Sequence, residues 1–229
     1  MKKLWYAIKS IVYMYTIQYI VCIGAILLYL IFSNKGDILE YDIIYKYLII
    51  GITITIIPMI TYILRKYQQK EKKINIKKLL LTVPLGFGIS WFYNMLTINF
   101  QESTELMNLH IIVIILYTVI LGPIFEELLF RYVALRKAEE VYSKKTALII
   151  ISCVFALLHS GIIGVLYAFL IGLILGRVYQ KEKNILYPIA IHISANLASI
   201  FVTGYNTWFL LVSIILLVLV IWCQKKLTN

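Results

Sequence analysis

Residues 111–135 of the chain read IIVIILYTVILGPIFEELLFRYVAL, an apolar run that contains two adjacent glutamates and one arginine. A run of this length can cross a bilayer as a single helix. Each ionised group near the bilayer centre costs about 2.5 to 3.5 kcal/mol on insertion scales, so such residues usually face the protein interior and usually mark a site. We therefore expect the chemistry of this protein at the segment from Phe125 to Arg131.

The composition of the whole chain points to a membrane protein. Its 229 residues are 62% hydrophobic and 14% charged, and the mean hydropathy is +0.88. A soluble domain of this size is less apolar, so we expect a single all-α domain at residues 1–229, built as a polytopic membrane helix bundle. The run from Leu4 to Phe32 is longer than the apolar region of a signal peptide and has no small-x-small cleavage site near its end. We interpret it as a retained first span.

The apolar runs predict about eight transmembrane helices, near residues 5–32, 43–64, 79–98, 111–135, 146–160, 162–179, 185–201 and 208–223. The connections between them alternate in charge: residues 33–42 hold one Lys and three acidic residues, whereas residues 65–78 hold seven Lys or Arg. Because basic connections stay in the cytoplasm, we expect a multi-pass protein of the cell membrane with both termini cytoplasmic.

Two further sequence features bear on partners and packing. The net charge of +11 is concentrated at the ends of the apolar runs and not along one amphipathic surface, so we expect membrane lipid and no nucleic acid as a partner. The three cysteines, Cys22, Cys153 and Cys223, lie inside apolar runs, and their odd number favours packing over a disulfide framework. Residues Gly164, Ala168, Gly172 and Gly176 recur at intervals of four and predict a close approach between two helices.

The charged residues of the opening stretch are not equivalent on a helix. Glu127 and Arg131 are one turn apart with the acid first, which is the favourable order for an i,i+4 ion pair. Glu126 is rotated by about 100° from Glu127 and cannot share that arginine equally. Glu126 therefore needs a partner from another helix.

Two later spans offer partners for Glu126. His159 follows Phe155 by four residues, and His192 precedes Asn196 by four, so each pair shares one helical face. An imidazole and a carboxamide on one face can donate hydrogen bonds to an oxyanion. His159 can hold a water or a metal, and Glu126 can take the proton of that water as a general base.

Simpler interpretations of the same residues exist. A lone histidine in an apolar helix is more often a hydrogen-bonded packing residue, and the Glu-Glu-x-x-x-Arg pattern also suits a helix-locking salt bridge or a proton relay. The occurrence of a glutamate pair and two histidines in successive spans favours a site. His110 lies beside a polar, acidic loop, and we expect it to be solvated.

Three motifs occur in order on separate predicted helices: Glu126-Glu127-x-x-x-Arg131, Phe155-x-x-x-His159 and His192-x-x-x-Asn196. This ordered set resembles the signature of the CPBP family, which comprises CAAX proteases and Abi-like bacteriocin-processing or immunity enzymes. The resemblance covers about residues 122–200, within an expected protease core at about 111–201.

The resemblance implies an intramembrane endopeptidase. In that family pattern Glu126 activates the water, His159 is its partner, and His192 with Asn196 supports the tetrahedral intermediate. Supporting roles fall to Glu127, Arg131 and Phe155. The implied substrate is a peptide or a membrane protein, such as the carboxyl-terminal region of a lipidated protein or a bacteriocin or signalling precursor, cleaved near the cytoplasmic side of the membrane.

The sequence leaves the cofactor open. The family has been treated as a metallopeptidase family, yet the chain has no His-Glu-x-x-His motif, and a catalytic zinc normally takes three protein ligands. Glu126, His159 and His192 can supply them for Zn²⁺. In a metal-free alternative, Glu126 and His159 hold the water directly.

Two other function classes compete with a protease. A non-catalytic membrane scaffold or immunity protein would keep the fold and bind a partner. A proton-coupled transporter would use Glu126, His159 and His192 as a relay, but the chain shows no inverted repeat, and Arg131 would hinder cation passage. The Ile-, Lys- and Tyr-rich composition indicates a bacterium of low GC content, which favours a peptide substrate or bacteriocin immunity over prenylated substrates.

Overall fold

The computed structural model of the chain describes residues 2–32, 41–97, 115–202 and 204–228, and within these ranges the regular structure is helical, without a β-strand. The predicted all-α class is therefore confirmed. His110, the expected solvated histidine, lies outside the described residues. Cys22 is buried, as expected for a packing residue, but Cys153 is exposed, so the packing interpretation is wrong for Cys153.

The described elements join into eight consecutive rods. They are α1 (Lys2–Phe32), α2 (Tyr41–Lys66), α3 (Ile76–Leu80) with α4 (Thr82–Thr97), the rod of η2 (Ile115–Leu121), α6 (Gly122–Glu127), η3 (Leu128–Leu135) and α7 (Arg136–Val141), then α8 (Lys144–Ala156), α9 (Ile162–Glu182), α10 (Leu186–Ser199) and α11 (Thr207–Thr228). We call the rod from η2 to α7 the motif rod. Each rod falls on one of the predicted apolar runs.

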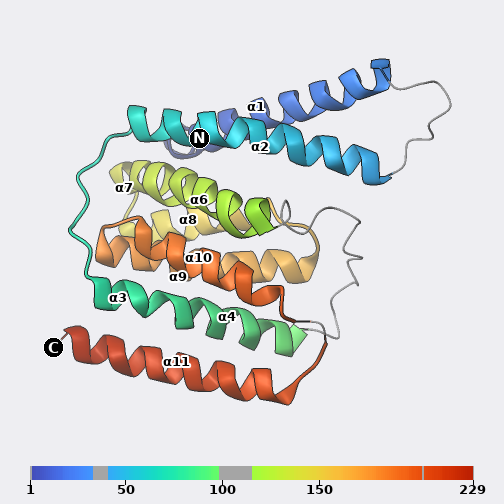
Figure 1. Ribbon diagram of the computed structural model, residues 1–229. Helices are drawn as coiled ribbons and strands as arrows, with labels where there is room; N and C mark the ends of the chain where they lie inside the picture. The colour runs from blue at the N-terminus through green and yellow to red at the C-terminus, as the bar shows by residue number, and fades with distance from the viewer. Residues whose placement is uncertain (1, 33–40, 98–114, 203, 229) are drawn as a thin grey trace.

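Consecutive rods run in opposite directions (Figure 1), and among them α1 packs on α2 and α8 packs on α9. The layer of α1 and α2 covers one side of the motif rod, whereas α4 and α11 form the opposite side of the bundle. The motif rod and α10 lie between these layers, and α10 contacts both α4 and α6. The bundle therefore alternates in direction along the chain, but rods that follow one another in sequence are not always neighbours in space.

The motif rod departs from regular α-helical winding. Both η2 and η3 have wider, π-type turns, and α6 between them begins with Gly122 and Pro123. Proline lacks an N–H and its ring clashes with the preceding turn, so the chain widens there. A Cβ at Gly122 would lie 2.9 Å from the carbonyl oxygen of Tyr117, so only glycine fits this approach. These turns set the direction in which Glu126 and Glu127 point.

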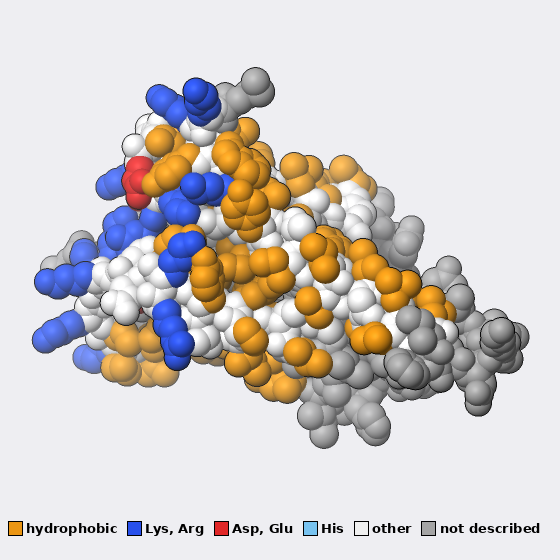
Figure 2. All heavy atoms as spheres, turned by 90° about the horizontal axis from the view of Figure 1, so that it is seen from above, with side chains coloured by type: hydrophobic (Ala, Val, Ile, Leu, Met, Phe, Trp, Pro, Cys, Tyr) orange, Lys and Arg blue, Asp and Glu red, His pale blue; other side chains and the backbone are white. Residues whose placement is uncertain are grey.

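The surface divides along the bundle axis. Lys and Arg gather at one end, and hydrophobic side chains cover the middle (Figure 2). Three helical stretches in the described residues are long and apolar enough to cross a membrane, namely Lys2–Leu28, Ile76–Thr97 and Ile162–Glu182. That all eight rods cross the membrane stays a prediction.

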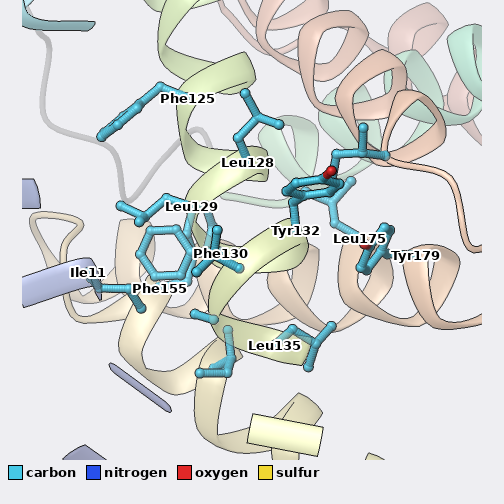
Figure 3. Packing of buried hydrophobic residues seen from close by; sticks show 14 of the residues in the cluster. Ile11, Phe125, Leu128, Leu129, Phe130, Tyr132, Leu135, Phe155, Leu175 and Tyr179 are labelled. Atoms are coloured by element: carbon cyan, nitrogen blue, oxygen red, sulfur yellow. The ribbon is translucent and has the colours of Figure 1, made fainter. Parts of the chain in front are cut away.

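The core is centred on the motif rod. Leu129, Phe130, Ala134 and Leu135 are at most 1% exposed, and they pack against α1, α8 and α9 (Figure 3). The small-residue face of α9 packs closely on α8, because a Cβ at Gly176 would lie 2.4 Å from the Leu148 side chain. The same helices therefore build the core and carry the predicted site.

Candidate active site

Arg131 and Glu127 form a buried ion pair on the motif rod. Arg131 Nη1 donates to Glu127 Oε1 at 2.8 Å, and the two side chains are 2% and 0% exposed. The guanidinium also lies 4.4 Å from the centre of the Phe155 ring, and Nη2 is 3.5 Å from the carbonyl oxygen of Gly172. Because both charges are removed from solvent, each depends on the other for compensation. The ion pair expected from the i,i+4 spacing is present.

Glu127 also holds His192, which the sequence spacing did not indicate. His192 Nδ1 lies 2.8 Å from Glu127 Oε1. An ionised carboxylate only accepts hydrogen bonds, so Nδ1 is the donor, and the Nε2 atom of His192 is left for other partners. This Nε2 lies 3.8 Å from Glu126 Oε2. Glu127 therefore orients the imidazole, and Nε2 of His192 faces Glu126 at a distance longer than a hydrogen bond.

The two glutamates occupy different environments. Glu126 is 26% exposed, whereas Glu127 is fully buried. Neighbouring residues on a helix point about 100° apart, so one carboxylate faces the core and the other faces a cavity of about 300 Å³. The lining of this cavity is Thr118, Glu126, Phe155, His159, Tyr167, Ala168, Ile171, His192, Asn196, Ser199 and Ile200.

His159 reaches the same cavity from a turn beyond the end of α8. Its backbone N–H donates to the carbonyl oxygen of Ala156 at 3.0 Å, and its Nδ1 lies 3.0 Å from the carbonyl oxygen of Phe155. A carbonyl oxygen only accepts, so Nδ1 carries the proton and Nε2 is an acceptor. The predicted span 146–160 placed His159 inside the helix, whereas α8 ends at Ala156 and His159 lies in the turn that follows.

Asn196 lines the cavity from α10, one turn after His192. Its Nδ2 donates to the carbonyl oxygen of Thr118 at 2.8 Å. A carboxamide carries two N–H groups, so one stays for a ligand when the other holds Thr118. The contact also fixes α10 against η2, on the cavity side of the motif rod.

The structure thus brings Glu126, His159, His192 and Asn196 to one cavity, with Glu127 and Arg131 buried behind it. Phe155 lies between the two groups, with its ring 4.8 Å from the His159 ring and 6.1 Å from the His192 ring. Sequence reasoning did not identify Thr118, Ala168, Ser199 or Ile200 as lining residues. Small and apolar side chains carry no local signal that separates a cavity wall from ordinary packing.

The donor set does not form a three-ligand metal site. Among the described residues, no three or more His, Cys, Asp or Glu side chains are grouped so that they could hold a metal ion. A catalytic zinc normally takes three protein ligands. Zn²⁺ binding by Glu126, His159 and His192 therefore stays a prediction.

Comparison with known proteins agrees with the family resemblance. Residues 108–198 match the family described as type II CAAX prenyl endopeptidase Rce1-like. The match covers less than half of the chain and includes all three motifs. It confirms the resemblance to CAAX proteases of the CPBP family. No curated protein and no solved structure matches the chain.

Proposed function

From the match of residues 108–198 to Rce1-like CAAX endopeptidases, we propose that this protein is an intramembrane endopeptidase that uses a glutamate-activated water. The observation that carries the proposal is the convergence of Glu126, His159 and His192 on one cavity of about 300 Å³ inside an apolar bundle. Isolated polar groups in such surroundings are costly, so a convergent set is expected to serve a reaction.

Glu126 is the general base in this proposal. Its carboxylate and the Nε2 of His159 hold a water, and Glu126 takes one proton as the oxygen attacks the scissile carbonyl carbon. The C–O bond forms while the carbonyl π electrons move to the oxygen. Proton transfer by a positioned side chain contributes about 10²- to 10⁴-fold to the rate.

His192 and Asn196 support the tetrahedral intermediate. The remaining N–H of Asn196 and an Nε2–H of His192 in its imidazolium form donate to the oxyanion. That imidazolium would be flanked by Glu127 at 2.8 Å and Glu126 at 3.8 Å. Collapse of the intermediate breaks the C–N bond, and the protonated Glu126 gives its proton to the leaving amine. One donor of this kind is worth about 10² to 10³ in rate.

Glu127 and Arg131 act on the reaction through His192. The carboxylate of Glu127 fixes the tautomer and the orientation of the imidazole, and Arg131 balances the charge of Glu127 in a site without solvent. We assign Glu127 as a positioning residue. The sequence predicted Glu127 as the partner of Arg131 with a supporting role, and the contact with His192 suggests the form that this support takes.

The proposed peptidase activity is tested by searching membranes for new protein amino termini, because each cleaved peptide bond creates one. Cells that make the wild-type chain are compared with cells that make Glu126→Gln at matched abundance, and free amino termini are labelled and identified by mass spectrometry. Glu140→Gln is the matched control, because Glu140 accepts a hydrogen bond from the Tyr6 hydroxyl at 2.6 Å at the surface, away from the cavity.

We expect termini that depend on Glu126 and persist with Glu140→Gln. If Glu126→Gln yields the same termini as the wild type, Glu126 is not the base. If no terminus depends on the chain at all, a non-catalytic scaffold or immunity role takes precedence. Proton flux through reconstituted vesicles that is lost in Glu126→Gln would favour the transporter.

A further inference from the structure

The cavity extends from Glu126 and His192 toward one end of the bundle only. Along α9, Tyr167, Ala168 and Ile171 line the cavity, whereas the next residues on that face, Leu175 and Tyr179, are 0% and 2% exposed and belong to the core. The change from cavity wall to filled core occurs within one helical turn. Beyond this point the described residues of this face belong to the packed core and not to the lining of the cavity.

The same change from cavity wall to buried core occurs along α10 and the motif rod, the two other rods that line the cavity. On α10, Asn196, Ser199 and Ile200 line the cavity, and the residues before His192, such as Ile191, are buried. On the motif rod, Thr118 lies on the cavity side of Glu126, whereas the segment 128–135 on the other side is buried throughout. Figure 3 shows this segment packed with Leu175 and Tyr179. The motif rod, α9 and α10 therefore all close the cavity at the same end.

The closed end is the basic end. The motif rod runs from the closed segment into Arg136 and Lys137, and α9 runs into Lys181 and Lys183. Figure 2 shows the Lys and Arg side chains gathered at one end of the molecule. The segment 157–175, which includes the α8–α9 turn at the opposite end, holds no Lys, Arg, Asp or Glu. Basic connections of membrane proteins stay in the cytoplasm.

We infer that the substrate enters the cavity from the extracytoplasmic half of the membrane, as an uncharged internal peptide segment. The inference rests on the proposed endopeptidase function and specifies its substrate. It differs from the cytoplasmic-side cleavage expected from the family resemblance, because the filled core separates Glu126 from the basic end of the bundle.

The residues that line the cavity decide which side chains the substrate segment can carry beside the scissile bond. The lining contains no Lys or Arg, and the nearby Arg131 is buried against Glu127. An acidic side chain or a terminal carboxylate beside the scissile bond would therefore be desolvated next to the Glu126 carboxylate, with no Lys or Arg in the lining to pair with it, which is costly. The apolar walls, made by Phe155, Ile171 and Ile200, suit small or aliphatic side chains.

Access is tested by cysteine labelling of the full chain in intact cells. In a background with Cys22, Cys153 and Cys223 replaced by serine, Ser199→Cys places a thiol in the cavity wall, and Lys145→Cys places one at the basic end. Both positions are exposed. A membrane-impermeant maleimide should label Ser199→Cys in intact cells, and it should label Lys145→Cys only after permeabilisation.

Two labelling results would overturn the inference. One is a Ser199→Cys thiol that reacts only after permeabilisation, which would place the cavity on the cytoplasmic side. The other is a Lys145→Cys thiol that reacts from outside, which would invert the orientation. Labelling needs no cleavage, so a protein that is labelled as expected but cleaves nothing would disprove the proposed function and leave the access route intact.

Substrate chemistry is tested with a peptide segment that the wild-type protein cleaves, chosen from the termini identified in membranes. The segment is presented in two forms, one within a longer chain and one that ends in a free carboxylate just after the scissile bond. In a second comparison, the residue beside that bond is either Asn or Asp. We expect cleavage of the longer chain and of the Asn form, and at least a 10-fold loss for the free carboxylate and for Asp. Preference for the free carboxylate would overturn the inference.

Discussion

The two halves of the bundle on either side of Glu126 and Glu127 differ in what fills them. Toward the basic end, buried side chains such as Phe130 and Leu135 fill the space around the motif rod, and the buried charges of Glu127 and Arg131 pair with each other. Toward the other end, the same rods enclose a polar cavity. The difference shows that one set of helices can supply stability on one side of a residue pair and chemistry on the other.

The largest expected effect comes from removing the base on the cavity side. Glu126→Gln keeps the size of the side chain and most of its hydrogen bonding but cannot accept the proton of water. We expect cleavage to fall by about 10²- to 10⁴-fold while the folded amount stays within the range of the wild type. Product formation and folded protein are measured on the same membranes. A variant with full activity would remove Glu126 from the role of base.

The next effect comes from breaking the ion pair on the filled side. Arg131→Ala leaves Glu127 buried without its cationic partner, and such a loss costs about 3 to 5 kcal/mol. We expect lower abundance and a lower melting temperature as well as lower activity. Arg136→Ala is the control, since Arg136 lies at the end of the same rod in a half-buried position and donates a hydrogen bond to the Tyr179 hydroxyl, at 3.4 Å. If Arg131→Ala folds normally and is inactive, Arg131 belongs with the catalytic residues.

A smaller effect is expected where α4 and α10 approach each other. A Cβ at Gly86 would lie 2.0 Å from Ser194 Oγ and 2.5 Å from the carbonyl oxygen of Ile191, and that carbonyl belongs to the backbone. Gly86→Ala should therefore cost about 1 to 3 kcal/mol. Gly164→Ala is the matched control, because nothing lies within 4 Å of its Cβ, and helix propensity favours alanine by about 1 kcal/mol. Melting temperatures in detergent compare the two. Equal destabilisation would contradict the close packing.

The smallest effect concerns the loop at the basic end. Glu71 accepts a hydrogen bond from the Ile185 backbone N–H at 3.0 Å, and burial raises the pKa of its carboxyl above the usual value. A raised folded-state pKa means that the folded chain binds the proton more tightly than the unfolded chain does. Stability therefore falls as pH rises from the ordinary pKa of 4.5 through the raised value.

Glu71→Gln removes this titration and keeps the acceptor oxygen. The variant should gain stability relative to the wild type with increasing pH, by less than about 0.5 kcal/mol, because the site is half-buried. The measurement is the melting temperature of both proteins across the range from pH 4 to pH 7. A difference that shrinks as pH rises would show that the sign is wrong.

Much of the fold could be predicted because it depends on local properties. Apolar runs of spanning length locate the helices, and alternation of charge between connections matches the antiparallel order of the rods in Figure 1. The Glu127–Arg131 pair followed from the i,i+4 spacing alone. These features depend on residues close together in the sequence, so periodicity identifies them.

The sequence by itself determined the helical class, the apolar character of the rods and the residue types available for catalysis. Only the tertiary structure decided that His192 contacts Glu127, 65 residues earlier, and that the cavity lies on one side of them. Helical periodicity fixes which residues share a face, but it does not fix the rotation and depth of one helix against another. Those are set by packing, here by the wide turns around Gly122 and by the close approach of Gly86 to Ser194.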